Sequence, residues 1–137
     1  MSSPQISGRT AYSQALIVFE PDAIVASMSD DVRILVAVHD QPLQGKDTAA
    51  FLFGVLTQEL TPFRLTGEIV EGDQSVVLFQ TTLRGQPADG LNVVTAGADA
   101  LVSELTVFFR PLAALQLIAE VIGSHMAQRF GPPEGLR

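Results

Sequence analysis

Few side chains in this sequence could carry out chemistry, and Tyr12 is the first candidate along the chain. It is the only tyrosine, the sequence has two histidines, and cysteine is absent. A phenol at the mouth of an apolar cavity can donate a hydrogen bond to a ligand carbonyl. In the alternative interpretation, the ring packs in the core and its hydroxyl bonds to backbone or water. Tyr12 is therefore a candidate catalytic residue with a structural alternative.

Glu104 is a candidate acid or base within a segment that is otherwise rich in apolar residues. In an extended chain, Val102 and Phe108 share a face with Glu104, and Leu105 lies on the opposite face. Polarity alone would turn the face with Glu104 to solvent, where its carboxylate would be hydrated or ion-paired. Against an apolar cavity, by contrast, burial would raise the pKa of Glu104 and allow proton transfer near neutral pH.

His39 and Asp40 follow the first expected strand directly. Neighbouring residues of an extended chain point to opposite faces, so these two do not form a dyad. Each is a candidate at the rim of a cavity, with simple surface exposure as the alternative. His125 has no neighbouring ligand, and the absence of cysteine excludes a zinc-thiolate site. We therefore expect neither a metal nor a cofactor.

Charge and composition restrict the partners. The net charge is −7 and the eight basic residues are scattered, so no basic stripe is available for nucleic acid or an anionic membrane. The first ten residues lack the pattern of a signal peptide. The longest apolar runs fall short of the roughly 20 residues that cross a bilayer. We expect a cytoplasmic protein that binds neither nucleic acid nor membrane.

The elements that would position these residues follow from hydrophobic periodicity and turn signals. A chain of 137 residues, 47% of them hydrophobic, is typical of one compact domain. Helices are predicted at residues 9–19, 22–28, 47–60 and 111–130. Strands are predicted at residues 32–38, 63–71, 74–84, 88–96 and 101–110. Asp22 and Asp47 are the expected N-caps. Residues 1–8 are expected to be flexible, 41–46 to form a loop, and 131–137 to form a tail after Gly131-Pro132-Pro133 ends the last helix.

Helices set apart from a meandering antiparallel sheet define an α+β fold. A strongly curved antiparallel or mixed sheet, with the N-terminal helices on its concave face, forms a cone with an apolar interior, where a small apolar molecule would bind. The expected lining residues are Leu16, Ile34, Val36, Val38, Phe51, Val55, Phe79, Val102 and Phe108. The last helix is apolar over most of its surface, so we expect it to contact a second subunit in a homodimer.

The order of elements resembles the SnoaL-like branch of the nuclear transport factor 2-like superfamily, with the segments PLQGKD and LTVFFRPLAAL as its sequence signals. The resemblance covers residues 9–127 and implies the cone-shaped fold. It does not select an activity, because the superfamily contains polyketide cyclases, ketosteroid isomerases, epoxide hydrolases, dehydratases and non-catalytic binding domains.

Residues 12–31 are similar to the ketosteroid isomerases without a gap, and the resemblance places Tyr12 on their oxyanion-binding tyrosine. The same register puts Val36 at the position of the general base, and a valine cannot take a proton. The second oxyanion-hole acid falls near Asp89 or Leu91, and the position of Glu104 faces the cavity in the isomerases. The aspartate-arginine-aspartate set of the epoxide hydrolases is not matched, since Gly85-Gln86 follows Arg84.

The sequence thus predicts a SnoaL-like protein that binds a small apolar or polycyclic molecule. Acid–base chemistry would depend on Tyr12 together with Glu104, His39 or Asp40. The alternative is a binding or dimerisation module without turnover, whose cone is filled by its own side chains.

Overall fold

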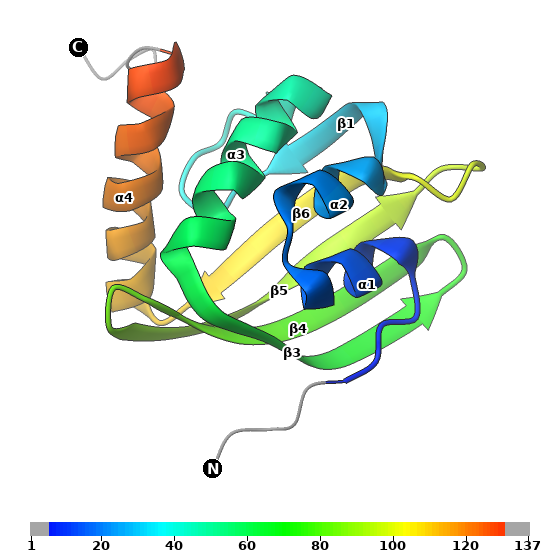
Figure 1. Ribbon diagram of the computed structural model, residues 1–137, viewed down its shortest axis with the longest axis horizontal. Helices are drawn as coiled ribbons and strands as arrows, with labels where there is room; N and C mark the ends of the chain where they lie inside the picture. The colour runs from blue at the N-terminus through cyan, green and yellow to red at the C-terminus, as the bar shows by residue number, and fades with distance from the viewer. Residues whose placement is uncertain (1–5, 131–137) are drawn as a thin grey trace.

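The computed structural model describes residues 6–130, in which a curved six-stranded sheet carries helices on one face (Figure 1). The helices are α1 (Ala11–Val18), α2 (Pro21–Ala26), α3 (Lys46–Glu59) and α4 (Leu112–Phe130). The strands are β1 (Met28–Leu35), β2 (Leu43–Gln44), β3 (Leu60–Glu71), β4 (Gln74–Leu83), β5 (Gln86–Ala96) and β6 (Val102–Arg110). The predicted α+β class is confirmed.

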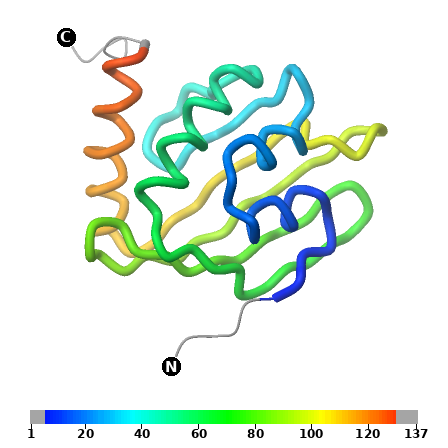
Figure 2. Tube along the Cα trace, in the orientation of Figure 1, coloured from blue at the N-terminus to red at the C-terminus, as the bar shows by residue number. Residues whose placement is uncertain are grey.

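The sheet is mixed, with the strand order β2-β1-β6-β5-β4-β3. Strands β3 to β6 form the predicted antiparallel meander, whereas β1 joins its edge parallel to β6. Helices α1, α2 and α3 lie against the concave face (Figure 1). Figure 2 shows β6 leading directly into α4, which stands at one end of the sheet.

Alternation along β4 shows how the sequence separates the two faces of the sheet. Val77, Phe79, Thr81 and Leu83 are buried, and the alternate residues Leu78, Gln80 and Thr82 are more exposed. Because successive side chains of a strand point to opposite faces, this period of two directs one apolar face towards the helices. The other face of the sheet is left to solvent.

Helix α1 begins in a capping box. The Ser13 backbone amide donates to the Thr10 hydroxyl oxygen at 3.1 Å, and the Thr10 amide donates to the Ser13 hydroxyl oxygen at 3.0 Å. These bonds satisfy two amides near the helix start. The helix ends at Phe19, which has a left-handed φ of 59°. Tyr12 and Leu16, one turn apart, are thereby turned into the core.

The predicted caps of α2 and α3 are wrong. The N-cap of α2 is Glu20, because Pro21 takes the first helical position, where its missing amide hydrogen costs nothing. Asp22 instead lies in the first turn. The N-cap of α3 is Gly45, and the helix includes Asp47 in its first turn. A carboxylate in the first turn stabilises the helix through the dipole without being a cap.

The first strand also differs from its prediction. Residues 29–31, expected to follow the second helix, belong to β1, where they lie in an irregular stretch between Met28 and Arg33, which both pair with β6. The strand ends at Leu35 rather than Val38. The expected loop 41–46 contains the short strand β2, which pairs with β1.

The expected flexible lead-in is ordered where the structure describes it. The Ile6 amide donates to the Leu65 carbonyl oxygen at 3.2 Å, and its side chain packs against the core. Residues 1–5 and 131–137, with the predicted helix stop and tail, lie outside the described residues. Between residues 6 and 130, no helix has the length and apolarity to span a bilayer.

Candidate ligand pocket

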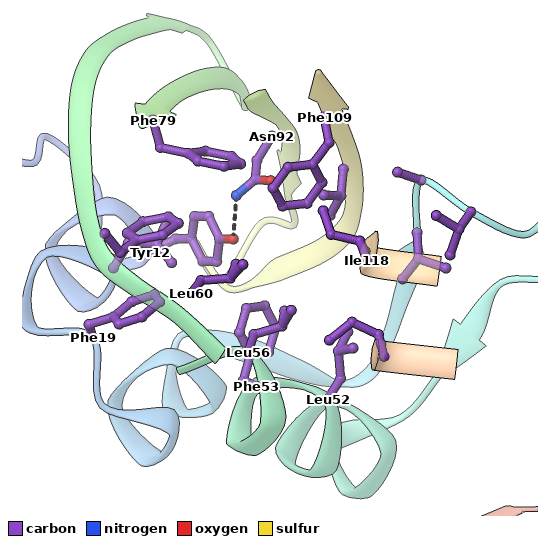
Figure 3. Close-up of a pocket in the computed structure, with 17 residues that line it drawn as sticks. Tyr12, Phe19, Leu52, Phe53, Leu56, Leu60, Phe79, Asn92, Phe109 and Ile118 are labelled. Carbon is purple, nitrogen blue, oxygen red and sulfur yellow. Dashed lines mark hydrogen bonds between the residues drawn. The ribbon is translucent and has the colours of Figure 1, made fainter. Parts of the chain in front are cut away.

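An apolar pocket lies between the concave face of the sheet and α1, α3 and α4 (Figure 3). Its cavity volume is about 50 Å³. The lining side chains are Tyr12, Leu16, Phe19, Val36, Ala37, Val38, Leu52, Phe53, Leu56, Leu60, Phe63, Phe79, Asn92, Val107, Phe109, Ile118 and Ile122. Tyr12 and Asn92 alone among these carry polar side-chain atoms.

These two polar residues are bonded to each other. The Asn92 amide Nδ2 donates to the Tyr12 phenol oxygen at 2.8 Å, as the dashed line in Figure 3 marks. Tyr12 is 2% exposed and Asn92 is 5% exposed. Burial raises the pKa of Tyr12 far above its ordinary value of 10.0, and the bond from Asn92 lowers it by a smaller amount. The phenol therefore keeps its proton at neutral pH and is able to donate a hydrogen bond.

Aromatic rings form a continuous wall of the pocket. Phe63 stacks on Phe19 with ring centroids 4.3 Å apart and on Phe79 at 4.9 Å. Phe79 then meets Phe109 edge to face at 5.3 Å. The rings come from the end of α1 and from β3, β4 and β6, so three strands and a helix fix the wall together. Such a surface binds apolar and aromatic groups.

Four of the nine predicted lining residues line the pocket, namely Leu16, Val36, Val38 and Phe79, and so does the candidate catalytic residue Tyr12. Four others, Ile34, Phe51, Val55 and Val102, belong to the hydrophobic core or pack against it without lining this cavity. Phe108 is 51% exposed and lies on the outer face of the sheet. Its prediction as a lining residue is wrong.

Glu104 also faces outward, which corrects the orientation implied by the resemblance. Its carboxylate pairs with the Arg33 guanidinium at 3.4 Å, and its side chain is 44% exposed. Strand alternation puts Glu104 with Phe108 outside, while Val107 and Phe109 line the pocket. The simple polarity argument therefore describes this strand correctly.

Val102 departs from that alternation and is 2% exposed. The register between β5 and β6 shifts between Thr95 and Ala96, and an irregularity of this kind changes which face a side chain takes. Sequence periodicity alone does not reveal such a shift. Val102 therefore joins the core although Glu104, two residues later, points to solvent.

His39 and Asp40 lie in the loop after β1 and are exposed. His39 Nδ1 accepts from the Gln41 amide at 3.1 Å. Neither residue lines the pocket, although Val38 before them does. Their predicted catalytic roles therefore find no support in the lining of this pocket.

Among residues 6–130, no carboxylate or imidazole lines the pocket. Val36 does line it, at the position where the resemblance places a general base. Asp89, one alternative for the second oxyanion-hole acid, pairs instead with Arg110 at 3.4 Å. Among residues 6–130 there is no group of three or more histidine, aspartate or glutamate side chains placed to hold a metal ion.

Asn92 is the polar pocket residue that sequence reasoning missed. Alternation along β5 puts it on the same buried face as Ala88 and Val94. An asparagine among small and branched apolar residues on the inward phase of a strand is a signal for a buried polar contact, because such a group needs a partner. That pattern could have identified it.

Three solved structures show which fold surrounds this pocket. A steroid delta-isomerase from Pseudomonas aeruginosa aligns with a TM-score of 0.78 at 15% identity, over 93% of this chain and 98% of that one. An uncharacterized protein with a cystatin-like fold from Silicibacter pomeroyi gives 0.77 at 22% identity, over 82% and 81%. A SnoaL-like protein of unknown function from Burkholderia thailandensis gives 0.59 at 18% identity, over 74% and 90%. This chain has the nuclear transport factor 2-like fold.

The nuclear transport factor 2-like fold confirms the resemblance at the level of architecture. No protein-family model and no curated protein matches the sequence. The fold hosts many unrelated activities, so it does not by itself assign one to this chain. The function has to be argued from the residues of the pocket.

Proposed function

We propose that this chain binds a small apolar molecule that carries a carbonyl or a similar acceptor, without acid–base conversion of that molecule. The observation that supports this proposal is the Tyr12–Asn92 pair, the single polar feature of an otherwise apolar pocket. Pockets of this kind use a few placed polar groups to orient an apolar ligand.

The Tyr12–Asn92 pair favours a ligand that carries a hydrogen-bond acceptor over one that carries a donor. Asn92 donates to the phenol oxygen, so the phenol hydrogen is free to point to a ligand carbonyl. Hydrogen bonds in a chain polarise one another, and a low dielectric strengthens each of them. Because the raised pKa of Tyr12 keeps the proton on the phenol, the ligand oxygen is bound by a neutral donor.

The missing base argues against proton transfer. Abstraction of a proton beside a carbonyl requires a base within hydrogen-bond reach. Val36 occupies the expected place, and Glu104 is held outside by Arg33. Tyr12 can polarise a carbonyl, but no lining side chain can then take a proton from the adjacent carbon.

The cavity volume limits the ligand. About 50 Å³ is well below the roughly 300 Å³ or more of typical ligand sites. Since a cavity that holds benzene measures about 150 Å³, even a one-ring ligand such as acetophenone requires displacement of the aromatic wall or of α4, and a polycyclic ligand requires a larger one. The same volume supports a second candidate function, a non-catalytic module in which Phe19, Phe63 and Phe79 fill the cone.

Ligand pairs that differ only in the acceptor test the proposal. Acetophenone and ethylbenzene are titrated while amide chemical shifts of the full chain are followed by NMR. We expect acetophenone to bind more tightly, and Tyr12→Phe to weaken it about tenfold without affecting ethylbenzene, as loss of one hydrogen bond implies. Phe109→Leu alters both affinities, whereas the matched outer-face variant Phe108→Leu alters neither.

Two results would decide against ligand recognition by the pair. Equal affinity of both compounds in the wild type and in Tyr12→Phe would refute the role of the phenol. If neither compound shifts pocket amides at millimolar concentration, the filled-cone module is the correct reading. Deuterium exchange into acetophenone above the buffer rate would overturn the absence of acid–base chemistry.

A further inference from the structure

A second cavity, with a volume of about 360 Å³, lies at the end of the sheet opposite α4 and is lined by residues within 9–12, 70–75 and 94–102. Its walls come from the start of α1, from the turn between β3 and β4, and from β5, β6 and the loop that joins them. Figures 1 and 2 show these segments together at one end of the sheet, away from α4. Ligand sites usually have volumes of roughly 300–1,000 Å³, so the second cavity has room for a small molecule as it stands.

Tyr12 stands between the second cavity and the apolar pocket, because it lines both of them. It is the one residue that the two linings share. Helices α3 and α4 supply part of the wall of the apolar pocket, but over residues 6–130 neither helix lines the second cavity. The two cavities are therefore separate sites, and a molecule in the second one would lie against the opposite side of Tyr12.

The wall contributed by β4 contains a buried hydroxyl group without a partner. Ser75 is 7% exposed, lies on the inward-facing phase of β4 and lines the second cavity. Its Oγ makes no hydrogen bond with any of the described residues. Thr81, on the same inward-facing phase of the strand, instead donates to the Pro62 carbonyl oxygen at 2.8 Å. Because buried polar groups are normally paired, the Ser75 hydroxyl indicates a polar partner inside the cavity.

The start of α1 contributes further hydrogen-bond donors to the second cavity. The capping box uses the backbone amides of Thr10 and Ser13. The amides of Ala11 and Tyr12, the first two residues of the helix, have no acceptor within the described part of the chain. Both residues line the cavity. Unpaired amides and the partial positive charge of a helix start together favour an anionic group at this wall.

The charged side chains near the second cavity limit the charge of that anion. Arg9, just before α1, and Asp73, in the turn between β3 and β4, are both exposed and both line the cavity. Glu68 accepts from the Arg9 amide at 2.8 Å without lining the cavity. Two acids close to one guanidinium disfavour a doubly charged group such as phosphate. A single carboxylate on the side of α1, away from Asp73, is the anion that this arrangement favours.

The walls that the strands contribute are mainly aliphatic. Val70, Val94 and Val102 line the cavity from β3, β5 and β6. Among the described residues, Tyr12 is the one aromatic residue in the lining. Aliphatic walls favour a hydrocarbon group, because contact with them removes apolar surface from water. A molecule with a carboxylate at one end and a short hydrocarbon tail at the other matches both kinds of wall.

We propose that the second cavity binds a small monocarboxylate with an aliphatic tail. The donors at the start of α1 and the Ser75 hydroxyl hold the carboxylate, Arg9 adds a positive charge at the rim, and the tail packs against the three valines. A ligand of about eight non-hydrogen atoms is expected to bind with a dissociation constant on the order of 1 mM. The inference does not rest on the proposed function, because it concerns a different cavity and a charged ligand.

Hexanoate and hexanamide, which are similar in size and differ in charge, test the proposal. Amide signals of the full chain are followed by NMR during each titration. Hexanoate should shift the amide signals of Ala11 and Tyr12, and hexanamide should bind at least about tenfold more weakly, because hydrogen bonds to a charged acceptor are the stronger ones. Near-ultraviolet circular dichroism of the one tyrosine gives a second readout of the same site.

A matched pair of serine variants tests the role of the buried hydroxyl. Ser75→Ala should weaken hexanoate about tenfold, as loss of a hydrogen bond to a charged group implies. Ser103→Ala is the control, because the Ser103 hydroxyl donates to the Thr95 carbonyl oxygen at 3.1 Å and does not line the cavity, so hexanoate affinity should stay unchanged. Asp73→Asn should tighten hexanoate about twofold by removing an opposing charge. Far-ultraviolet circular dichroism confirms that each variant is folded.

Four results would overturn the proposal. Hexanamide that binds as tightly as hexanoate would exclude recognition of the carboxylate, and acetate that binds as tightly would show an adventitious ion only. Unchanged Ala11 and Tyr12 signals at about 20 mM hexanoate would exclude the site, since a millimolar complex would be nearly saturated there. Loss of hexanoate binding in Phe109→Leu but not in Ser75→Ala would place the ligand in the apolar pocket. None of these results depends on whether acetophenone binds the apolar pocket.

Discussion

Asn92 donates a hydrogen bond to Tyr12 across 80 residues of sequence, and the two groups satisfy each other inside an apolar pocket. Tyr12 comes from α1 and Asn92 from the middle of β5. Their contact therefore requires the helix to be seated on the sheet. Because an unpaired polar group in this environment is costly, the pair reports on correct assembly of the domain.

The coupling between these two residues can be measured. Asn92→Leu should lower the free energy of unfolding by about 1–3 kcal/mol, because it leaves the phenol without a partner. Adding Tyr12→Phe should restore part of that loss, since the unpaired hydroxyl is then gone. Urea unfolding of the two single variants and the double variant gives the coupling energy. If the two substitutions changed the free energy of unfolding additively, the contact between Tyr12 and Asn92 would contribute nothing to stability.

Ionisation of Tyr12 offers a spectroscopic test without interference. The sequence contains one tyrosine and no tryptophan, so the tyrosinate absorbance near 295 nm reports on this residue alone. Because burial raises the pKa of Tyr12 in the folded state, its contribution to stability is complete below pH 10.0 and is lost progressively above it. The tyrosinate absorbance should therefore rise over the same pH range in which the protein unfolds. Circular dichroism monitors the unfolding. A titration near pH 10 in folded protein would contradict the burial.

Two phenylalanines on opposite faces of the sheet should differ in their contribution to stability. Phe79 is 3% exposed and contacts two other rings, so Phe79→Ala should cost about 3–5 kcal/mol. Phe108 is 51% exposed, and Phe108→Ala should change the unfolding free energy of the monomer by less than about 1 kcal/mol. Denaturation at low protein concentration measures both without a contribution from association. Similar losses would mean that Phe108 is covered in solution.

Glu59 should make the stability of the domain pH-dependent. Arg84 donates to both Glu59 oxygens at 3.1 and 3.0 Å, and His125 Nε2 lies 3.5 Å away, so α3, α4 and the β4–β5 hairpin meet there. The hydrogen bond from Arg84 lowers the pKa of Glu59 from 4.5, with smaller contributions from its charge and from His125.

The sign of this dependence follows from linkage. A lowered pKa in the folded state stabilises the fold above about pH 4.5, and the stabilisation is lost as the pH falls below that value. Thermal unfolding of Glu59→Gln and wild type should therefore differ at pH 7 and converge near pH 3. Glu71→Gln, at an exposed position outside this cluster, serves as a control. If the difference in unfolding temperature between Glu59→Gln and wild type were the same at pH 3, the stability change would come from packing and not from the charge of Glu59.

The sequence by itself determined the features that depend on near neighbours along the chain. The alternation along β4 and the turn at Gly72-Asp73 predicted a hairpin, because side-chain period and turn chemistry are local properties. The same holds for α4, which starts after Pro111. The α+β class followed from the order of such elements, and the outward orientation of Glu104 followed from polarity alone.

Only the tertiary structure decided which distant groups meet. The partner of Tyr12 is 80 residues away, and the face taken by Val102 depends on a register shift between β5 and β6. Neither follows from periodicity, because strand register and helix seating are set by packing across the whole domain. The cavity volume is also set by packing across the whole domain, since a small displacement of one lining side chain changes that volume.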